Sequence, residues 1–311
     1  MARAYASTII AAPVETVWSL IRDFNGLPSW VPGITDSRIE DGLDADVVGC
    51  VRAFRLGDGT LVRERLLSLD DHRYSFSYNF ETPAFPVTEY LARVTLIPVT
   101  NGDSTFAEWE ATFDERPEDA GRYAGIIADG VFKAGWDALK AKIARERPGM
   151  PAGAARWQGL PPHKVFCSSV IPAPVEAVWA TIRDFAGMAA WHEDITRMHM
   201  LGGVRPDKVS GVRDFLFGEG HLNEELIQLC DRTRSYTYRI TKSPMPWLHY
   251  VSGPRLRPVT DAGHTFGTWF GDWTASPADD LVLIPQVHHG VYQKAFDTVA
   301  ARLARAPAGS A

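Results

Sequence analysis

The stretch IAAPVETVWSLIRDFNGLPSWVPGI at residues 10–34 decides the fold of this protein, because the chain contains it twice. The second copy, IPAPVEAVWATIRDFAGMAAWHEDI at residues 171–195, agrees with the first at 14 of 25 positions, without a gap and at an offset of 161 residues. Agreement this dense indicates an internal duplication. A period of this length is that of a whole domain, far longer than a solenoid repeat.

Length supports the same organisation, because 311 residues are typical of about two domains. A copy of roughly 150 residues is large enough to bury about 70% of its unfolded surface without a disulfide or a structural metal. We predict a first domain at residues 1–147 and a second at 163–306. The Pro-, Gly- and Ala-rich stretch 148–162 reads as a linker, and 307–311 as a disordered tail.

Charge and composition exclude several classes of function. A net charge of −6 argues against a nucleic-acid partner, which requires a basic face. No apolar run approaches the roughly 18 residues needed to span a membrane, and the N-terminus lacks the apolar core of a signal peptide. The three cysteines, Cys50, Cys167 and Cys230, show no metal-binding spacing. We therefore expect a cytoplasmic protein with reduced thiols and without a metal or cofactor.

Hydrophobic periodicity predicts the same element order in both copies. A strand at 3–10 stops before Pro13, which suits the first turn of a helix, and Leu27–Val31 suits a second short helix. Each copy closes with a long helix, whose apolar stripe is Phe132, Trp136, Leu139 and Ile143 in the first copy and Tyr292, Phe296, Val299 and Leu303 in the second. Between them we expect six antiparallel strands, near 34–40, 47–56, 60–69, 73–80, 87–99 and 104–114.

The expected fold class is thus α+β, with a curved antiparallel sheet of about seven strands around one long C-terminal helix in each copy. Such a sheet and helix do not fill all the space between them, so we expect an interior cavity, where function would lie.

The shared pattern Ala-Pro-Val-Glu-x-Val-Trp-x-x-Ile-Arg-Asp-Phe-x-Gly-x-x-x-Trp resembles the opening of the START-like (SRPBCC) superfamily. The following motifs are similar to the polyketide cyclase/dehydrase subgroup, which is related to bacterial relatives of the abscisic-acid receptors. These motifs are Gly49-Cys-Val-Arg52, Gly57-Asp-Gly59 and Glu64 in the first copy, and Gly211-Val-Arg213, Gly218-Glu-Gly220 and Glu225 in the second. The resemblance implies tandem helix-grip domains, a fold that enzymes, carriers and receptors share.

The resemblance also implies a set of residues that face the cavity. They are the acids Glu64 and Glu225, the tyrosines Tyr90 and Tyr250, and the tryptophans Trp109 and Trp269. Strand alternation from Glu225 would turn Asn223 and His221 inward and Glu224 outward. Trp30 and Trp191 would serve either as core packing or as cavity wall, and the repeated Arg52 and Arg213 favour a structural salt bridge.

Histidines are distributed unevenly, since seven of the nine lie between residues 192 and 289 of the second copy. This excess points to acid–base chemistry there, because imidazole titrates nearest neutral pH. We single out His192 near the cavity mouth, His221 on the strand of Glu225, and His288 one helical turn before Tyr292. Tyr292 and His289 complete the candidate ligand-binding set. A metal site from His192, Glu193, His288 and His289 lacks ligand spacing.

Two functions from different classes fit these patterns. The leading hypothesis is a cyclase or dehydratase for a polyketide-like intermediate, with His221, Glu225, His288, His192 and Tyr250 as catalytic residues of the second copy. The alternative is a non-catalytic carrier of a hydrophobic small molecule. In both cases the partner is a hydrophobic small molecule, either free or tethered to a carrier protein. A third hypothesis is that one copy is a degenerate scaffold that completes the other.

Overall fold

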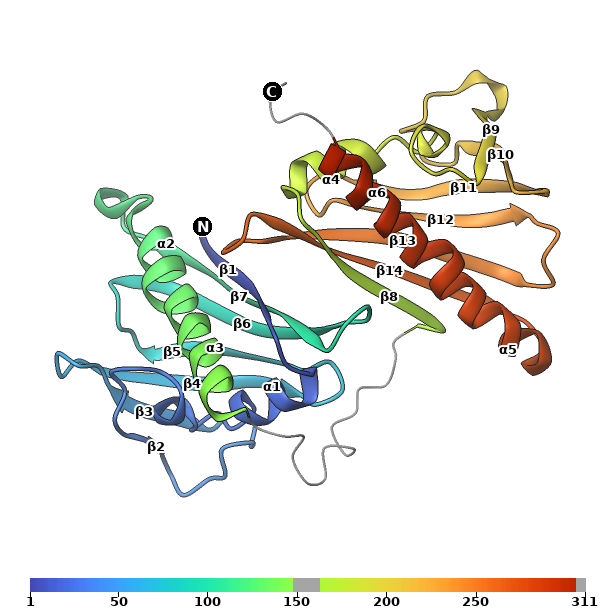
Figure 1. Ribbon diagram of the computed structural model, residues 1–311. Helices are drawn as coiled ribbons and strands as arrows, with labels where there is room; N and C mark the ends of the chain where they lie inside the picture. Colours follow the sequence, from blue (N-terminus) through green and yellow to red (C-terminus); the bar gives the residue numbers. More distant parts are fainter. Residues whose placement is uncertain (148–162, 306–311) are drawn as a thin grey trace. The chain divides into compact units, whose positions relative to one another are not determined.

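A computed structural model describes residues 1–147 and 163–305. They form two compact units, each with one seven-stranded antiparallel sheet and a helical segment lying over one of its faces (Figure 1). The strand orders are the same, β1-β7-β6-β5-β4-β3-β2 in the first unit and β8-β14-β13-β12-β11-β10-β9 in the second. The predicted fold class of tandem helix-grip domains is confirmed. The predicted linker 148–162 and tail 307–311 lie outside the described residues.

The elements of the first unit follow the predicted order. Its strands are β1 (Ala2–Ile10), β2 (Ser37–Ile39), β3 (Val51–Arg55), β4 (Leu61–Asp70), β5 (Ser75–Thr82), β6 (Val87–Val99) and β7 (Ser104–Glu115). Its helices are α1 (Val14–Ile21), α2 (Arg122–Ile127) and α3 (Ala134–Glu146), with a π-helical turn at Ala128–Lys133 between the last two. The predicted second short helix is a single 3-10 turn at Leu27–Ser29.

The second unit repeats this order. Its strands are β8 (Val165–Ile171), β9 (Ile195–Met200), β10 (Val212–Phe217), β11 (Gly220–Cys230), β12 (Ser235–Lys242), β13 (Leu248–Val259) and β14 (His264–Thr274). Its helices are α4 (Val175–Ile182), a 3-10 turn at Met188–Ala190, α5 (Pro277–Pro285) and α6 (Lys294–Arg305), with a π-helical turn at Gln286–Gln293.

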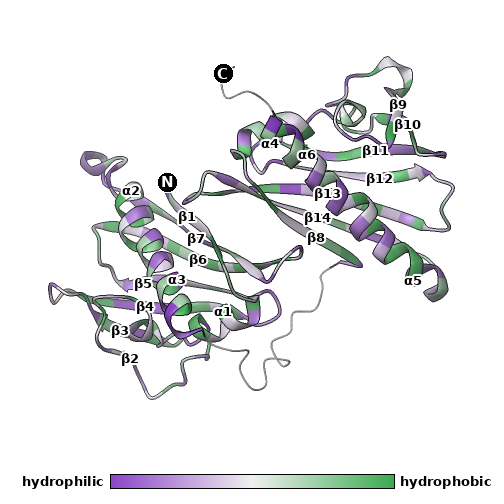
Figure 2. Cartoon of the chain, viewed as in Figure 1, coloured by the Kyte–Doolittle hydropathy of each residue, from purple (hydrophilic) through white to green (hydrophobic). Residues whose placement is uncertain are grey.

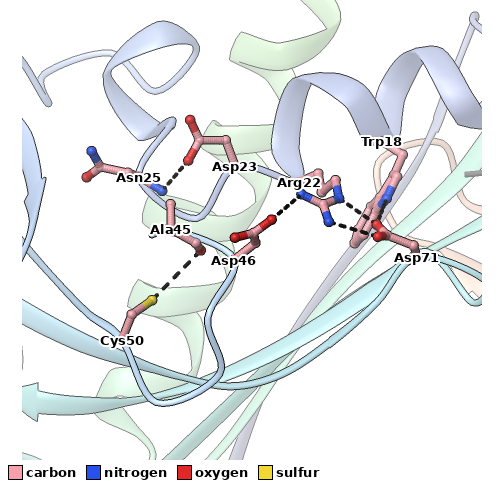
Figure 3. A network of polar contacts seen from close by, with 8 residues as sticks. All are labelled: Trp18, Arg22, Asp23, Asn25, Ala45, Asp46, Cys50 and Asp71. Atoms are coloured by element: carbon pink, nitrogen blue, oxygen red, sulfur yellow. Dashed lines mark hydrogen bonds and ion pairs between the residues drawn. The ribbon is translucent and has the colours of Figure 1, made fainter. Parts of the chain in front are cut away.

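The repeated opening stretch fastens the first helix of each unit to the sheet. Trp18 Nε1 donates to Asp71 Oδ1 at 2.8 Å, and Arg22 binds the same carboxylate through two hydrogen bonds of 2.6 and 2.8 Å (Figure 3). Trp179, Arg183 and Asp231 repeat this clamp, with a Trp179 Nε1–Asp231 Oδ1 distance of 2.9 Å. The duplicated Trp and Arg therefore have a structural role.

The closing helical segment buries one stripe of side chains against the sheet. Hydrophobic and hydrophilic residues follow one another along α3 and α6, as an amphipathic helix requires (Figure 2). A π-helical turn adds one residue to the interval between neighbouring stripe positions. In the first unit the stripe is Tyr123, Ile127, Phe132, Trp136, Leu139 and Ile143, and in the second it is Leu283, Val287, Tyr292, Phe296, Val299 and Leu303. The C-terminal part of each stripe, from Phe132 and from Tyr292 onward, is the part that was predicted.

Candidate functional site

A difference of one residue in a hairpin decides which acid of the second unit faces the interior. Arg52 lies opposite Glu64 across β3 and β4, whereas Arg213 lies opposite Glu224 across β10 and β11. The second hairpin is therefore one residue shorter, and the offset between the units falls from 161 to 160 residues after it. Because strand side chains alternate between faces, a slip of one residue reverses every orientation. The predicted inward orientation of Glu225 is wrong, and Glu224 is the counterpart of Glu64.

Both inward glutamates are held by the repeated arginines. Arg52 Nε donates to Glu64 Oε2 at 2.6 Å, and Arg213 Nε donates to Glu224 Oε2 at 2.7 Å. Each guanidinium also donates to a backbone carbonyl of the segment after the first helix, Phe24 or Phe185, and lies 3.9 Å from that residue's ring centroid. All four charged side chains are buried. Glu64 faces inward as predicted, but the salt bridge occupies its carboxylate.

Three further predicted residues lie on the outer face of the second sheet. His221 is exposed, and its Nε2 is 2.6 Å from Asp214 Oδ2. Asn223 is buried on this face, and its Nδ2 donates to the same Asp214 oxygen at 2.9 Å. Glu225 pairs with the half-exposed Arg239 at 2.7 Å. The predicted inward orientation of His221 and Asn223 is wrong for the same reason as that of Glu225.

The π-helical turn places His288 and His289 differently from what a regular α-helix would predict. Val287, five residues before Tyr292, occupies the buried stripe where a regular helix would have placed His288. His288 is half-buried and His289 is exposed, and their Nδ1 atoms lie 3.2 Å apart. Neither histidine belongs to the inward stripe, so the predicted position of His288 on it is wrong.

Trp191 and His192 do lie inside the second unit, with exposed fractions of 7% and 1%. The backbone N–H of Asp194 donates to His192 Nδ1 at 3.3 Å. Burial lowers the pKa of His192, so the ring is neutral and carries its proton on Nε2. Neither His192 Nε2 nor Trp191 Nε1 has a hydrogen-bond partner among the residues that the structure describes. A buried donor left in this state costs about 1–3 kcal/mol.

A chain of hydroxyl groups occupies the interior of the second unit between the sheet and the helical segment. The Tyr250 and Tyr292 hydroxyl oxygens are 2.6 Å apart, and that of Tyr292 is 2.8 Å from Ser252 Oγ. Ser252 Oγ also accepts from Trp269 Nε1 at 3.1 Å and donates to the Phe270 carbonyl at 2.7 Å. All four side chains are buried, as predicted for Tyr250, Trp269 and Tyr292.

The bonds of Ser252 set the direction of this chain. Its one hydrogen is used on the Phe270 carbonyl, so its oxygen accepts from Tyr292, and Tyr292 in turn accepts from Tyr250. The oxygen of Tyr250 is left as an acceptor at the open end. Burial raises the pKa of Tyr250 and of Tyr292 well above the ordinary value for tyrosine. Both phenols therefore stay protonated at physiological pH.

The first unit has a less polar interior at the matching positions. Trp109 Nε1 donates to the Tyr78 hydroxyl at 3.0 Å, and the Trp109 ring stacks on Phe132 and packs against Trp30. Tyr90 is buried and stacks on Phe80, with ring centroids 4.0 Å apart. These predicted residues all face inward, but the counterparts of Ser252 and Tyr292 are Ala92 and Phe132.

Sequence reasoning missed Ser252 as a functional candidate. Alternation along β13 places it on the same face as the predicted Tyr250. A comparison of the two copies at an offset of 160 also marks it, because serine there replaces the Ala92 of the first copy. The excess of histidine in the second copy drew attention away from its additional hydroxyl groups.

Each unit thus has a helix-grip fold that encloses aromatic and hydroxyl side chains between its sheet and its helical segment. The model of one family, described as polyketide cyclase / dehydrase and lipid transport, matches residues 1–144 and again 162–304. The chain belongs to this family. No curated protein matches it.

Several solved structures are similar to this chain. The protein XoxI from Bacillus cereus is 30% identical, with a TM-score of 0.42, over 48% of this chain and 100% of its own. A protein from Thermobifida fusca is 32% identical, with a TM-score of 0.42, over 47% and 95%. The di-domain ARO/CYC BexL is 12% identical, with a TM-score of 0.42, and covers 99% of this chain and 100% of its own. In the described part of the chain, no helix is long and apolar enough to cross a membrane.

Proposed function

We propose that the second unit is a cyclase or dehydratase that acts on a hydrophobic, polyketide-like intermediate. The observation that carries the proposal is the buried chain from Tyr250 through Tyr292 to Ser252, which joins two phenols at 2.6 Å in an apolar interior. Membership of the polyketide cyclase/dehydrase family supports the same reaction class. The substrate would lie between the sheet and the helical segment, with Tyr250 at the end of the chain nearest to it.

The proposed reaction begins with an enol of the substrate, whose carbon forms a bond to a ketone carbon of the same molecule, while the enol C–O–H becomes a C=O group. The electron pair of the attacked C=O group moves to its oxygen. Tyr250 turns its hydrogen from Tyr292 to that oxygen and transfers it as a proton, and the Tyr250 oxygen receives the proton of the enol, so Tyr250 ends the step neutral. Dehydration uses the same exchange, in which the Tyr250 oxygen takes a proton from the carbon between the new ketone and the alcohol. Tyr250 gives its own proton to the leaving hydroxyl, which departs as water and leaves a C=C bond. The raised pKa of Tyr250 keeps the phenol neutral between these steps.

Replacement of single hydroxyl groups tests this proposal. Tyr250→Phe keeps the ring and removes the proton donor, so we expect turnover to fall by about 10²–10⁴. Tyr90→Phe at the matching position of the first unit is the control and should leave turnover unchanged. The measurement follows absorbance of the aromatic product from a synthetic poly-β-ketone thioester. Full turnover by Tyr250→Phe, with intact circular dichroism, would show that the hydroxyl chain does not carry the reaction.

A non-catalytic carrier is the second candidate function. It is favoured by the positions of His221 and Glu225, since both lie outside the interior and leave few acid–base groups within it. A carrier would return its ligand unchanged after prolonged incubation, whereas a cyclase would return a product smaller by one water molecule. Mass spectrometry of the recovered ligand separates the two. For the cyclase or dehydratase, we also propose that the substrate is either free or tethered to a separate carrier protein, and that the enzyme acts in the cytoplasm.

A further inference from the structure

The proposed reaction does not use the side-chain N–H groups of Trp191 and His192, which are both hydrogen-bond donors. Each is buried and has no acceptor in the described part of the chain. Their rings are neighbours, with centroids 5.8 Å apart. Among residues 1–147, the comparable buried atom without a partner is the acceptor Asn79 Oδ1. Unpartnered N–H donors therefore distinguish the second unit.

The state of His192 makes this pair donor-only. Its Nδ1 accepts from the Asp194 backbone, so Nε2 carries the hydrogen of the neutral ring. An indole N–H can only donate. A ligand that satisfies these atoms must present acceptor oxygens, and a ligand hydroxyl would serve only through its lone pairs. A carbonyl oxygen, with two lone pairs and no hydrogen, matches both donors.

The backbone around this pair is held in place from two sides. The Asp194 carbonyl accepts from the Gly218 N–H of the β10–β11 hairpin at 2.9 Å. The Asp194 carboxylate binds Lys294 Nζ, at the start of α6, at 2.5 Å. The segment therefore joins the hairpin to the helix, which limits how far the two rings can turn away. A binding group held in this way loses little freedom when a ligand arrives.

We propose that Trp191 and His192 form a subsite for a ketone oxygen of the bound molecule. This inference rests on the proposed function, in that it requires the second unit to bind a small molecule in its interior. It adds the ligand class, an aromatic or polycyclic ketone, and the two residues that select it. The first unit carries Trp30 and Val31 at these positions, so one of the two donors is absent there.

Two ligands of the same shape test the subsite. 9-Fluorenone carries one ketone, and fluorene replaces that ketone with a methylene group. We expect calorimetry on the full chain to show about tenfold tighter binding of fluorenone, because one neutral hydrogen bond contributes up to about 1.5 kcal/mol. The double variant Trp191→Phe/His192→Val should reduce this preference to less than about twofold. Trp30→Phe, the matched change in the first unit, should leave it unchanged.

An infrared measurement on the unmodified protein provides a second readout. A hydrogen bond weakens the C=O bond, so bound fluorenone should absorb at a lower frequency than in a hydrocarbon solvent, and the double variant should reverse this shift. Equal binding of both ligands, without a carbonyl shift, would overturn the subsite while leaving a binding function intact. If neither ligand binds, the proposal that the second unit binds such molecules fails, and the subsite with it.

Discussion

The neighbouring glutamates Glu224 and Glu225 have opposite surroundings. The Glu224 carboxylate is buried against Arg213, whereas Glu225 pairs with Arg239 at the surface. Removal of one member of a buried pair leaves an uncompensated charge, which costs about 3–5 kcal/mol, while a surface pair contributes at most about 1 kcal/mol. The two positions therefore allow a direct test of the strand register.

We predict that Glu224→Gln lowers the free energy of unfolding of the second unit by about 3–5 kcal/mol and that Glu225→Gln changes it by less than about 1 kcal/mol. Hydrogen exchange of amides in β10 to β14 measures this unit separately from the other. Similar losses in the two variants would contradict the register that places Glu224 inside.

Asp231 predicts a response to acid. Hydrogen bonds from Arg183 and Trp179 lower its pKa to about 2, below the value of about 4 for an unfolded aspartate. A lowered pKa stabilises the folded state above pH 4, and this contribution disappears as the pH falls towards 2. We expect Asp231→Asn to lose less stability than the wild type between pH 4 and pH 2, measured by urea unfolding at each pH. Glu219→Gln, in the exposed β10–β11 hairpin, is the control and should follow the wild-type curve.

At the scale of elements, the contact between β14 and the helical segment is unusually close at Gly271. A Cβ atom at this position would lie 2.3 Å from the Tyr292 hydroxyl oxygen. The first unit has the pair Ala111 and Phe132 at the same places, so a methyl group there accompanies a ring without a hydroxyl. The strand of the first unit therefore carries a methyl group at this contact, and the helical segment of the second unit carries a hydroxyl group in its place.

This contact predicts a non-additive pair of substitutions. Gly271→Ala should destabilise the second unit by about 1–3 kcal/mol, because the new methyl overlaps the hydroxyl. In the Tyr292→Phe background the same change should cost less than about 1 kcal/mol, since that oxygen is gone. Urea unfolding of the four proteins forms a double-mutant cycle. Additive effects would mean that the helix moves away freely from the strand.

Helices and strands were predictable from the sequence where a regular hydrophobic period governs them. The predicted orientations of side chains were wrong where one added or missing residue interrupts that period. The resemblance matched Glu225 to Glu64, because the shorter β10–β11 hairpin leaves no mark in composition, and strand alternation from Glu225 then gave the wrong face for Asn223 and His221. Helical spacing chose His288, because a regular period of 3.6 residues does not reveal the π-helical turn that buries Val287 five residues before Tyr292. Tyr250 lies inside as predicted, because it was matched directly to Tyr90 at an offset of 160 residues. His192, predicted near the cavity mouth, is buried.

At the scale of the whole molecule, duplication gave two units of the same topology with different interiors. The order of all seven strands repeats, and so do both clamps and both buried salt bridges. Ser252, Tyr292 and His192 stand where the first unit has Ala92, Phe132 and Val31. Residues that build the sheet and helices were therefore recognisable from their repetition, and residues that distinguish the site were recognisable from their differences.

This division predicts where a ligand will act on stability. A molecule that binds only the folded second unit at 100 times its Kd stabilises that unit by about 2.7 kcal/mol. With 9-fluorenone at this level, amide exchange should slow across β8 to β14 and remain unchanged in β1 to β7. Equal protection of both sheets would show that the first unit binds the same ligand with similar affinity.

The close approach of Gly271 to Tyr292 also constrains the evolutionary history of the duplicated gene. The pairs Ala with Phe and Gly with Tyr are both compatible with the backbone, but Ala with Tyr places two atoms 2.3 Å apart. The combination of Ala with Tyr carries the expected cost of about 1–3 kcal/mol, whereas Gly with Phe leaves the contact free of overlap. Whichever copy is nearer to the ancestor, the less costly route between them therefore passes through Gly with Phe. On that route the methyl group is lost before the hydroxyl is gained, or the hydroxyl is lost before the methyl is gained.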